Sequence, residues 1–216
     1  MKKLFIISFL LCIKICSYAQ EATTVWPYMY SDFKTGVVYF KAGQKAEIPV
    51  NIHLLESKLH YIDGDKIKEV DSDNVILLDV DNVKFYSFNG QMMRVVAEDE
   101  NSFIAELVLT DMAAMREAGG AYGSSSTTQA NMQLSSIAGS NADSYMLLKQ
   151  GKIDGKILIL EKKYYIISNG EIFPATKKGI ESQLSSDRQS EFKAFLKKEK
   201  IKWRDEGSIA KLLRFF

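Results

Sequence analysis

Two histidines, His53 and His60, are the side chains of this chain with the widest range of chemistry. An imidazole can accept a proton or bind a metal ion near neutral pH, so a catalytic site would first be sought there. The two lie seven residues apart, a spacing that places them on neighbouring strands of one connection. No HExxH, Gly-x-Ser-x-Gly or Walker sequence accompanies them, and no glycine-rich loop opens a helix. We therefore interpret both histidines as structural and expect no catalytic residue.

Carboxylate and amide side chains gather in three short segments, at 63–65, 71–74 and 79–82. Such oxygens could bind Ca²⁺, or two of them could act as a general acid and base. If the last segment is a strand, alternation places Asp79 and Asp81 on one face. None of the segments has the full spacing of an EF-hand loop, and Asp and Asn are common in turns for conformational reasons. We expect no metal and no cofactor, and Asp79 with Asp81 is the pair that a hydrolase would use.

An aromatic row lies near the start of the chain, where Trp26, Tyr28 and Tyr30 occupy every second position. In an extended backbone the three rings would point to one side. Such a row can stack on sugar rings or on a partner, or it can attach an N-terminal strand to the core, because aromatic side chains bury a large area. We favour the core role and keep Trp26, Tyr28 and Tyr30 as the candidate binding residues.

Residues 1–19 have the pattern of a secretory signal peptide. Two lysines precede an apolar run at 4–13 that is too short to span a bilayer, and small residues at 17 and 19 mark a cleavage site. Both cysteines, Cys12 and Cys16, lie in this segment, so the mature chain has none for a disulfide or a thiolate nucleophile. We predict an exported protein, either periplasmic or secreted.

Turn signals recur at short intervals between apolar runs. The strongest are the Asn-Gly pairs at 89–90 and 169–170, which suit type I′ hairpin turns. An Asp-Gly pair at 63–64 and a glycine at 43 mark two more. About eight or nine short strands precede residue 111, and two or three follow residue 144. The expected fold class is α+β and mainly antiparallel β, as a sandwich, a barrel-like sheet or stacked hairpins, with a short C-terminal helical segment.

The apolar period changes from two to 3.6 after Pro174. Thr176 and Asp205 are expected to cap two helices, and Ser186 with Gln189 fits a capping box for a third. The apolar residues of these helices are Phe192, Phe195, Leu196, Ile209, Leu212, Leu213 and Phe216. We interpret them as packing faces, with attachment of the lysine-rich helices to a membrane surface as the alternative.

A polar segment at 117–144, rich in Gly, Ser, Thr, Asn and Gln, divides the chain. We predict a signal peptide at 1–19, a β-rich body at 20–116 and a flexible loop or linker at 117–144. The remainder, 145–216, would be a β-hairpin followed by helices. Because an isolated hairpin is marginally stable in water, we expect this last part to share one core with 20–116.

Charge is distributed unevenly along the mature chain. Residues 177–216 carry 11 basic and 6 acidic side chains, a net charge of +5, whereas residues 20–176 carry 14 basic and 21 acidic ones, a net charge of −7. An acidic body favours attachment of its own basic tail. Nucleic acid is not an expected partner, because the chain is predicted to be exported.

Several short motifs are distributed along the mature chain. They are Trp26-Pro27-Tyr28, Gly36-Val37-Val38-Tyr39-Phe40, Tyr61-Ile62-Asp63, Gly120-Ala121-Tyr122-Gly123, Tyr164-Tyr165, Ala175-Thr176-Lys177-Lys178 and the lysine-rich end. Together they resemble the motifs of an uncharacterised family of secreted β-rich proteins of Bacteroidota. The similarity covers most of the mature chain and identifies a lineage without catalytic residues to carry over. It implies export across the inner membrane of a Gram-negative cell.

These observations favour an exported, non-enzymatic cell-envelope protein that acts as a binding or interaction module. Its partner would be a protein or a glycan of the envelope. One alternative is a glycan-active hydrolase that uses paired carboxylates, and another is membrane-surface attachment through the basic C-terminal helices.

Overall fold

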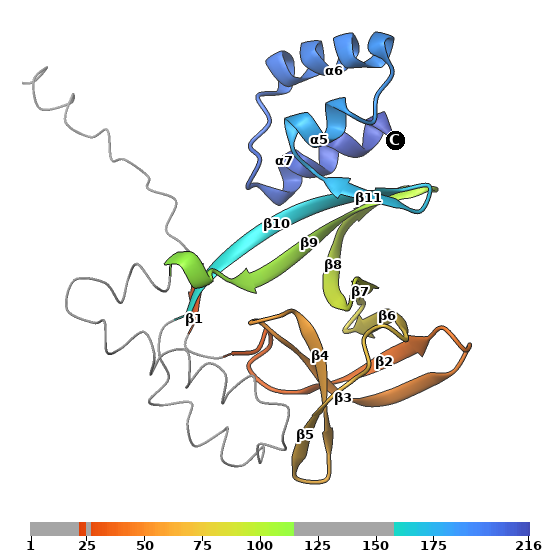
Figure 1. Ribbon diagram of the computed structural model, residues 1–216, viewed down its shortest axis with the longest axis vertical. Coiled ribbons are helices and arrows are strands. Elements are labelled where there is room, and N and C mark those ends of the chain that lie inside the picture. The colour runs from red at the N-terminus through yellow and green to blue at the C-terminus, as the bar shows by residue number, and fades with distance from the viewer. Residues whose placement is uncertain (1–21, 25–26, 115–157) are drawn as a thin grey trace, which may run out of the picture.

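A computed structural model describes residues 22–24, 27–114 and 158–216 of the chain (Figure 1). The predicted signal peptide at 1–19, the candidate residue Trp26 and the polar segment at 117–144 lie outside the described residues.

The described residues form one 11-stranded antiparallel sheet, in the order β1-β10-β9-β8-β7-β6-β2-β3-β4-β5, with β11 also paired to β10. The strands are β1 (Ala22–Thr24), β2 (Lys34–Phe40), β3 (Lys45–His53), β4 (Lys58–Asp63), β5 (Lys66–Glu69), β6 (Val75–Val80), β7 (Val83–Phe88), β8 (Gln91–Glu98), β9 (Ser102–Thr110), β10 (Leu158–Ser168) and β11 (Glu171–Pro174). Residues 112–114 are helical directly after β9, and further helices follow β11 at the C-terminal end. The predicted fold class, α+β and mainly antiparallel β, is confirmed.

The hairpin turns follow from local sequence. In both predicted Asn-Gly turns the two central residues have positive φ, 48° and 71° at Asn89 and Gly90, and 51° and 82° at the pair 169–170. This is the type I′ geometry that Asn and Gly tolerate. Asp81 and Asn82 also have positive φ, 53° and 64°, and they connect β6 to β7. Asp81 therefore lies in a turn, and the strand alternation considered for Asp79 and Asp81 does not apply.

Strand β10 is longer than the sequence indicated. The two apolar runs expected as separate strands, near 157–160 and at 164–167, are joined by Glu161, Lys162 and Lys163 into one strand of 11 residues. From Leu160 to Ser168, β10 pairs with β9, which precedes the polar segment in sequence. Strands from both sides of 117–144 thus belong to one sheet, while the proposed division into domains stays a prediction.

The strands β2 to β8 curl into an open, barrel-like body. The connection between β3 and β4 lies against β8, because the Ser57 hydroxyl donates to the Met92 carbonyl at 2.7 Å and the Met92 amide donates to the Ser57 carbonyl at 2.8 Å. The Thr110 amide of β9 likewise donates to the Leu54 carbonyl at 2.7 Å. The body encloses an apolar core of Val38, Val50, Ile52, Leu59, Val70, Val75, Leu78, Val80, Phe85 and Met92.

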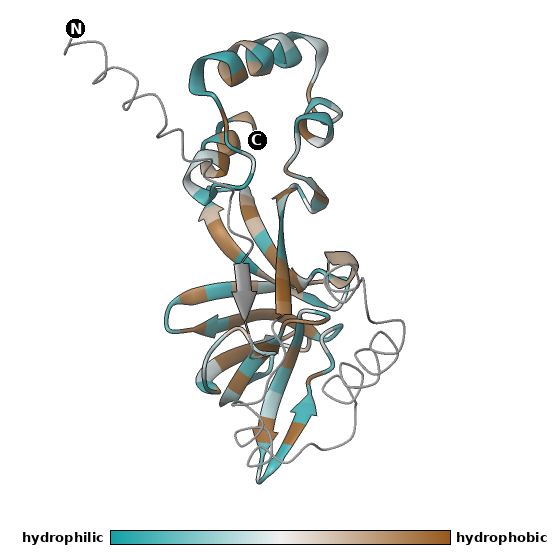
Figure 2. Ribbon diagram, turned by 90° about the vertical axis from the view of Figure 1, so that its left-hand side faces the viewer, coloured by the Kyte–Doolittle hydropathy of each residue, from teal (hydrophilic) through white to brown (hydrophobic). Residues whose placement is uncertain are grey.

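Residues 177–216 form a helical cap over one face of β8 to β11 (Figure 1). It consists of α5 (Lys177–Glu181), α6 (Ser186–Glu199), α7 (Glu206–Ala210) and the 3₁₀ helix η1 (Lys211–Phe215). Between cap and sheet lies a second core, made of Ile104, Tyr164, Ile166, Phe173, Ala175, Ile180, Leu184, Phe192, Ile209, Leu212, Leu213 and Phe215. Figure 2 shows apolar residues on the strands below the helices as well as in the barrel-like body.

Two of the three predicted helix caps are confirmed. The side chain of Thr176 accepts a hydrogen bond from the Gly179 amide at 3.1 Å, and that of Asp205 accepts one from the Ser208 amide at 2.8 Å. The capping box was wrong, because α6 begins one residue earlier, with Ser185 as a cap that makes no side-chain hydrogen bond. The Gln189 side chain instead donates to the carbonyls of residues 181 and 184, which fixes the turn before α6.

Candidate functional site: the outer apolar face of the sheet

A row of cross-strand neighbours runs across one face of the sheet, here called the inner face. In strand order the row is Val38, Leu78, Phe85, Arg94, Glu106 and Tyr164. Its first three members belong to the core of the barrel-like body, and its last belongs to the core below the cap. The two cores therefore lie on the same face, and a charged pair separates them.

The charged pair is part of a larger network. Arg94 donates to one carboxylate oxygen of Glu106 through Nε at 3.0 Å and Nη2 at 2.8 Å. Lys162 and the Tyr164 hydroxyl reach the other oxygen, at 2.9 and 3.1 Å. Arg94 also contacts Glu206 of α7 at 2.6 Å, so the network connects three strands to the cap.

The protonation states in this network are fixed near neutral pH. Burial alone would raise the pKa of Glu106, but hydrogen bonds from Lys162 and Arg94 outweigh it and hold that pKa below its usual range. Burial and the neighbouring Glu106 carboxylate raise the pKa of Tyr164. Because neither group exchanges a proton near pH 7, we interpret the network as structural.

The cap is not attached by the charge pattern that its sequence indicated. We expected the basic tail to attach to the acidic body, but the ion pair between cap and sheet among the described residues has the opposite polarity, with Arg94 on the sheet and Glu206 on the cap. Two of the cap's own cations form ion pairs within the cap: Lys211 pairs with Glu199, and Arg214 pairs with Glu191. Apolar packing in the second core is the main attachment.

The two histidines lie on the neighbouring strands β3 and β4, as their spacing predicted, and their rings stack on each other. Their ring centroids are 5.0 Å apart and their planes differ by 8°. The Tyr28 hydroxyl lies 2.9 Å from Nδ1 of His60, and Glu69 approaches Nε2 of the same ring at 3.9 Å. His53 is 2% exposed, and its Nε2 has no hydrogen-bond partner among the described residues.

Burial keeps both imidazoles neutral. It lowers the pKa of His60 to about 4, and burial together with the neighbouring His60 lowers the pKa of His53 to about 3. A general base works best when its pKa lies near the working pH. The pair is therefore poorly suited to proton transfer near pH 7, and its geometry supports the structural interpretation.

The aromatic row does not form a stacking surface in its described part. Tyr28 is buried, and its ring contacts Phe33 and both histidines. Tyr30 is half-buried, with its ring edge toward Phe85 at 6.4 Å and the Lys34 ammonium above it at 4.6 Å. These two candidate binding residues attach the segment before β2 to the body, which is the core role that we favoured.

The proposed carboxylate pair is not assembled either. Asp79 lies on β6 and accepts a hydrogen bond from the Asn82 amide at 3.1 Å, which closes the turn. Asp81 lies in that turn and pairs with Lys34 at 2.6 Å. The alternation that would have placed both on one strand face was wrong, because the strand ends at Val80. Within the described ranges, no group of three or more His, Cys, Asp or Glu side chains could hold a metal ion.

The strongest candidate is the face of β7 to β11 opposite the cap. Strand β9 is buried on both faces: Ile104 and its alternate neighbours point to the inner face, whereas Ala105 and Leu107 point away from it. On that second face lies an apolar cluster of Met93, Ala105 and Leu107, against which Phe88, Phe103, Leu109, Tyr165, Ile167 and Ile172 pack. We call these nine residues the outer apolar face. All six side chains packed against the cluster are partly exposed.

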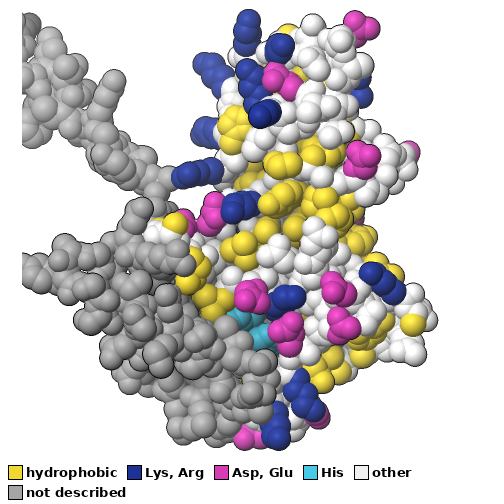
Figure 3. Space-filling view, viewed as in Figure 1, with side chains coloured by type: hydrophobic (Ala, Val, Ile, Leu, Met, Phe, Trp, Pro, Cys, Tyr) yellow, Lys and Arg dark blue, Asp and Glu magenta, His cyan; other side chains and the backbone are white. Residues whose placement is uncertain are grey.

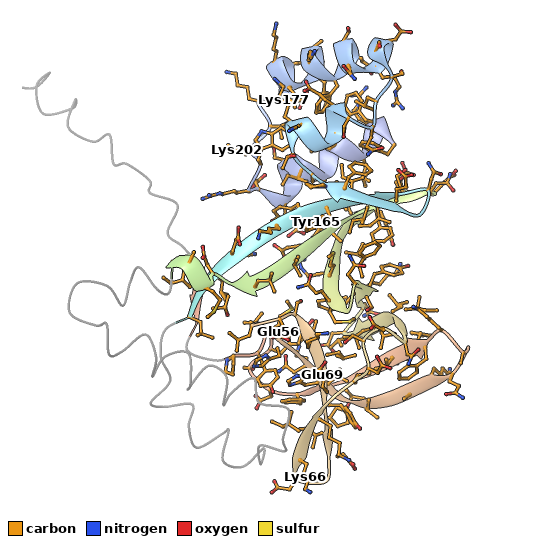
Figure 4. The ribbon with its side chains drawn as sticks, viewed as in Figure 1. Glu56, Lys66, Glu69, Tyr165, Lys177 and Lys202 are labelled. Atoms are coloured by element: carbon orange, nitrogen blue, oxygen red, sulfur yellow. The ribbon has the colours of Figure 1, made fainter. Side chains whose placement is uncertain are left out.

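The figures show this face below the helices. Hydrophobic side chains gather there, around β9 and β10 (Figure 3), and Tyr165 lies on the side of β10 that is turned away from the cap (Figure 4). The ring of Tyr86 stacks on Phe103, with centroids 4.7 Å apart, and extends the face along β7.

Charged residues beside this face neutralise each other. Lys84 on β7 donates to Glu98 at 2.7 Å, and Lys163 pairs with Glu161 on β10 at 2.8 Å. The face is therefore apolar and locally without net charge. A contiguous apolar surface of this kind is typical of interaction sites.

No family model, curated protein or solved structure matches this chain. In the part of the chain that the structure describes, no helix is long and apolar enough to cross a membrane. The candidate site thus rests on geometry alone.

Sequence reasoning missed the outer apolar face, although a signal was present. The run at 103–109 is apolar at nearly every position instead of alternating, and a strand of that composition is buried on both sides. The same holds for 164–167 on β10.

Proposed function

We propose that this chain is an exported, non-enzymatic cell-envelope protein that binds a partner protein through its outer apolar face. The observation that carries the proposal is the apolar cluster on the side of the sheet opposite the cap. The predicted signal peptide and the resemblance to exported proteins of Bacteroidota support a location in or outside the envelope.

The composition of the face favours a protein over a glycan as the partner. Sugar-binding surfaces combine aromatic rings with polar side chains that bind hydroxyl groups, whereas Leu109, Ile167 and Ile172 offer only aliphatic contacts. The neighbouring charges are already paired, so they offer little to a charged ligand. An apolar protein surface would complement this face best.

The hydrolase alternative has less support. Its named carboxylates, Asp79 and Asp81, are occupied in a turn and an ion pair. The histidines that could have provided a base have low pKa values because they are buried. We therefore retain the non-enzymatic proposal.

Site-specific photo-crosslinking in living cells tests the proposal. A photoreactive residue replaces Tyr165 on the outer apolar face, and in a matched strain it replaces Ile76, an apolar side chain on β6 that is 44% exposed and outside this face. We expect position 165 to form a discrete adduct with one envelope protein and position 76 to form none. The captured protein is then titrated against the purified chain.

In that titration, Ile167→Glu should weaken binding at least about tenfold, because it places a charge in an apolar contact, and Ile76→Glu should leave binding unchanged. Equal crosslinking at positions 165 and 76, or equal affinity of the two variants, would show that the partner does not bind at the outer apolar face. An adduct only with a second copy of the chain would show that this face serves self-association, and it would contradict the proposed envelope partner.

A further inference from the structure

The helical cap carries a concentration of basic side chains that the fold does not use. Residues 177–216 have a net charge of +5, although residues 20–176 have a net charge of −7. Nine of the cap's cations are exposed and have no ion-pair partner among the described residues. They are Lys177, Lys178, Arg188, Lys193, Lys197, Lys198, Lys200, Lys202 and Arg204.

These charges are gathered on the cap's solvent side. Lys177 at the start of α5 and Lys202 after α6 lie toward the same side of the cap (Figure 4), and further Lys and Arg side chains follow that side in Figure 3. The two residues are distant in sequence and come together only because the cap folds back on itself. A surface of this kind creates a positive potential that attracts extended anionic partners.

The apolar side of the cap is not available to such a partner. Phe192 of α6 and Ile209 of α7 are fully buried against the sheet, and Phe215 of η1 is 1% exposed. Lysine-rich helices that enter a bilayer do so with their apolar faces, which are occupied here. Any attachment to a membrane would therefore be electrostatic adsorption without insertion.

We propose that the basic side of the helical cap adsorbs to a membrane surface rich in anionic phospholipid headgroups. Lysine supplies most of the charge, and its ammonium group acts as a mobile point charge that suits a fluid layer of phosphates, whereas Arg suits fixed bidentate partners. The cap lies on the opposite side of the sheet from the outer apolar face, so one chain can adsorb and bind a partner at once.

Vesicle flotation tests this inference on the full exported chain. Vesicles of phosphatidylcholine mixed with phosphatidylglycerol should carry the protein upward at low salt, and vesicles of phosphatidylcholine alone should not. Because each lysine near an anionic surface strengthens partitioning about fivefold, replacing Lys177, Lys178 and Lys202 by Glu should abolish flotation. Raising the salt to 1 M should do the same for the unchanged chain, since the Debye length falls to about 3 Å.

A matched variant distinguishes the effect of the cap's lysines from the effect of the protein's net charge. Lys41, Lys45 and Lys66 are exposed on the barrel-like body, and their replacement by Glu changes the net charge by the same amount. This control should float like the unchanged chain. The inference is wrong if both triple variants lose binding equally, if the cap variant still floats, or if the chain binds soluble dextran sulfate but no anionic vesicle.

Discussion

Arg94 on β8 and Glu106 on β9 are directly opposed in the ladder and divide one face of the sheet into two apolar cores. The Glu106 side chain is 2% exposed, and Arg94 bonds the same carboxylate oxygen twice. Nη2 of Arg94 also donates to Glu206 of α7, and Nη1 approaches the same carboxylate. This pair therefore fixes the place where the cap meets the sheet as well as the boundary between the cores.

Replacing Arg94 by Met should destabilise the protein by about 3 kcal/mol, because a buried carboxylate then loses one of its two paired cations. The cap should also loosen, since Glu206 loses its partner. Urea unfolding measures the first effect, and hydrogen exchange at the amides of α7 measures the second.

Lys84→Met is the matched control. Lys84 also pairs with a carboxylate across strands, but both partners are exposed, so the loss should stay below about 1 kcal/mol. Similar losses in the two variants would show that the buried pair has no special role.

Acidification should destabilise the fold through the histidine pair. Below pH 6.5 the unfolded chain takes up protons on both imidazoles, whereas the folded chain resists protonation until pH reaches the lowered pKa values of about 4 at His60 and about 3 at His53. The stabilisation of the folded state by the two neutral imidazoles is complete above pH 6.5. It is lost as the pH falls from about 6.5 toward the folded pKa values, at up to about 1.4 kcal/mol per pH unit for each imidazole.

Chemical unfolding at several pH values between 7 and 5 measures this slope, in a range where most carboxylates remain ionised. In the double variant His53→Gln, His60→Gln, the free energy of unfolding should change little between pH 7 and pH 5. Unchanged steepness in that variant would assign the pH dependence to other groups.

Gly36 on β2 should not tolerate a side chain. A Cβ atom there would lie 2.7 Å from Val80 Cγ2 and 2.8 Å from Val50 Cγ2, inside the core of the barrel-like body. Gly36→Ala should therefore cost about 1–3 kcal/mol through overpacking, measured as a shift of the urea midpoint.

Gly207 in α7 provides the opposite case. The nearest atom to its added Cβ is an Asp205 oxygen at 3.9 Å, so Gly207→Ala meets no obstruction and should stabilise the helix by up to about 1 kcal/mol. Changes of the same sign in both variants would refute the packing argument at Gly36.

The helix caps should differ in their energetic value. Thr176→Ala and Asp205→Ala each remove a side-chain acceptor from a helix N-terminus and should cost about 1 kcal/mol. Ser185→Ala should change stability by less than about 0.5 kcal/mol, because Ser185 makes no capping hydrogen bond. Thermal unfolding of the three variants ranks them, and a large loss at Ser185 would contradict the described cap.

Sequence reasoning was accurate where structure depends on near neighbours. The Asn-Gly turns at 89–90 and 169–170 and the caps at Thr176 and Asp205 follow from the backbone preferences of those residues. The shared face considered for Asp79 and Asp81 is not formed, because Asp81 and Asn82 make a turn. The capping box was wrong because the Gln189 amide donates to carbonyls of the preceding turn. The capping box could not be rejected from the sequence alone, because the hydrogen bonds of Gln189 depend on how the chain folds before α6.

The sequence by itself predicted the Asn-Gly hairpin turns, the capped starts of α5 and α7, and the position of His53 and His60 on neighbouring strands, because each depends on residues close together in the chain. The alternation and turn signals repeated along the chain predicted the fold class. Only the tertiary structure placed Glu106 beside Arg94 and Lys162, and left the cluster around Leu107 on the side opposite the cap. These contacts join strands that are distant in sequence, and the register of such strands depends on which face of the whole sheet is buried. The residues next to a given position in the sequence do not determine which face that is.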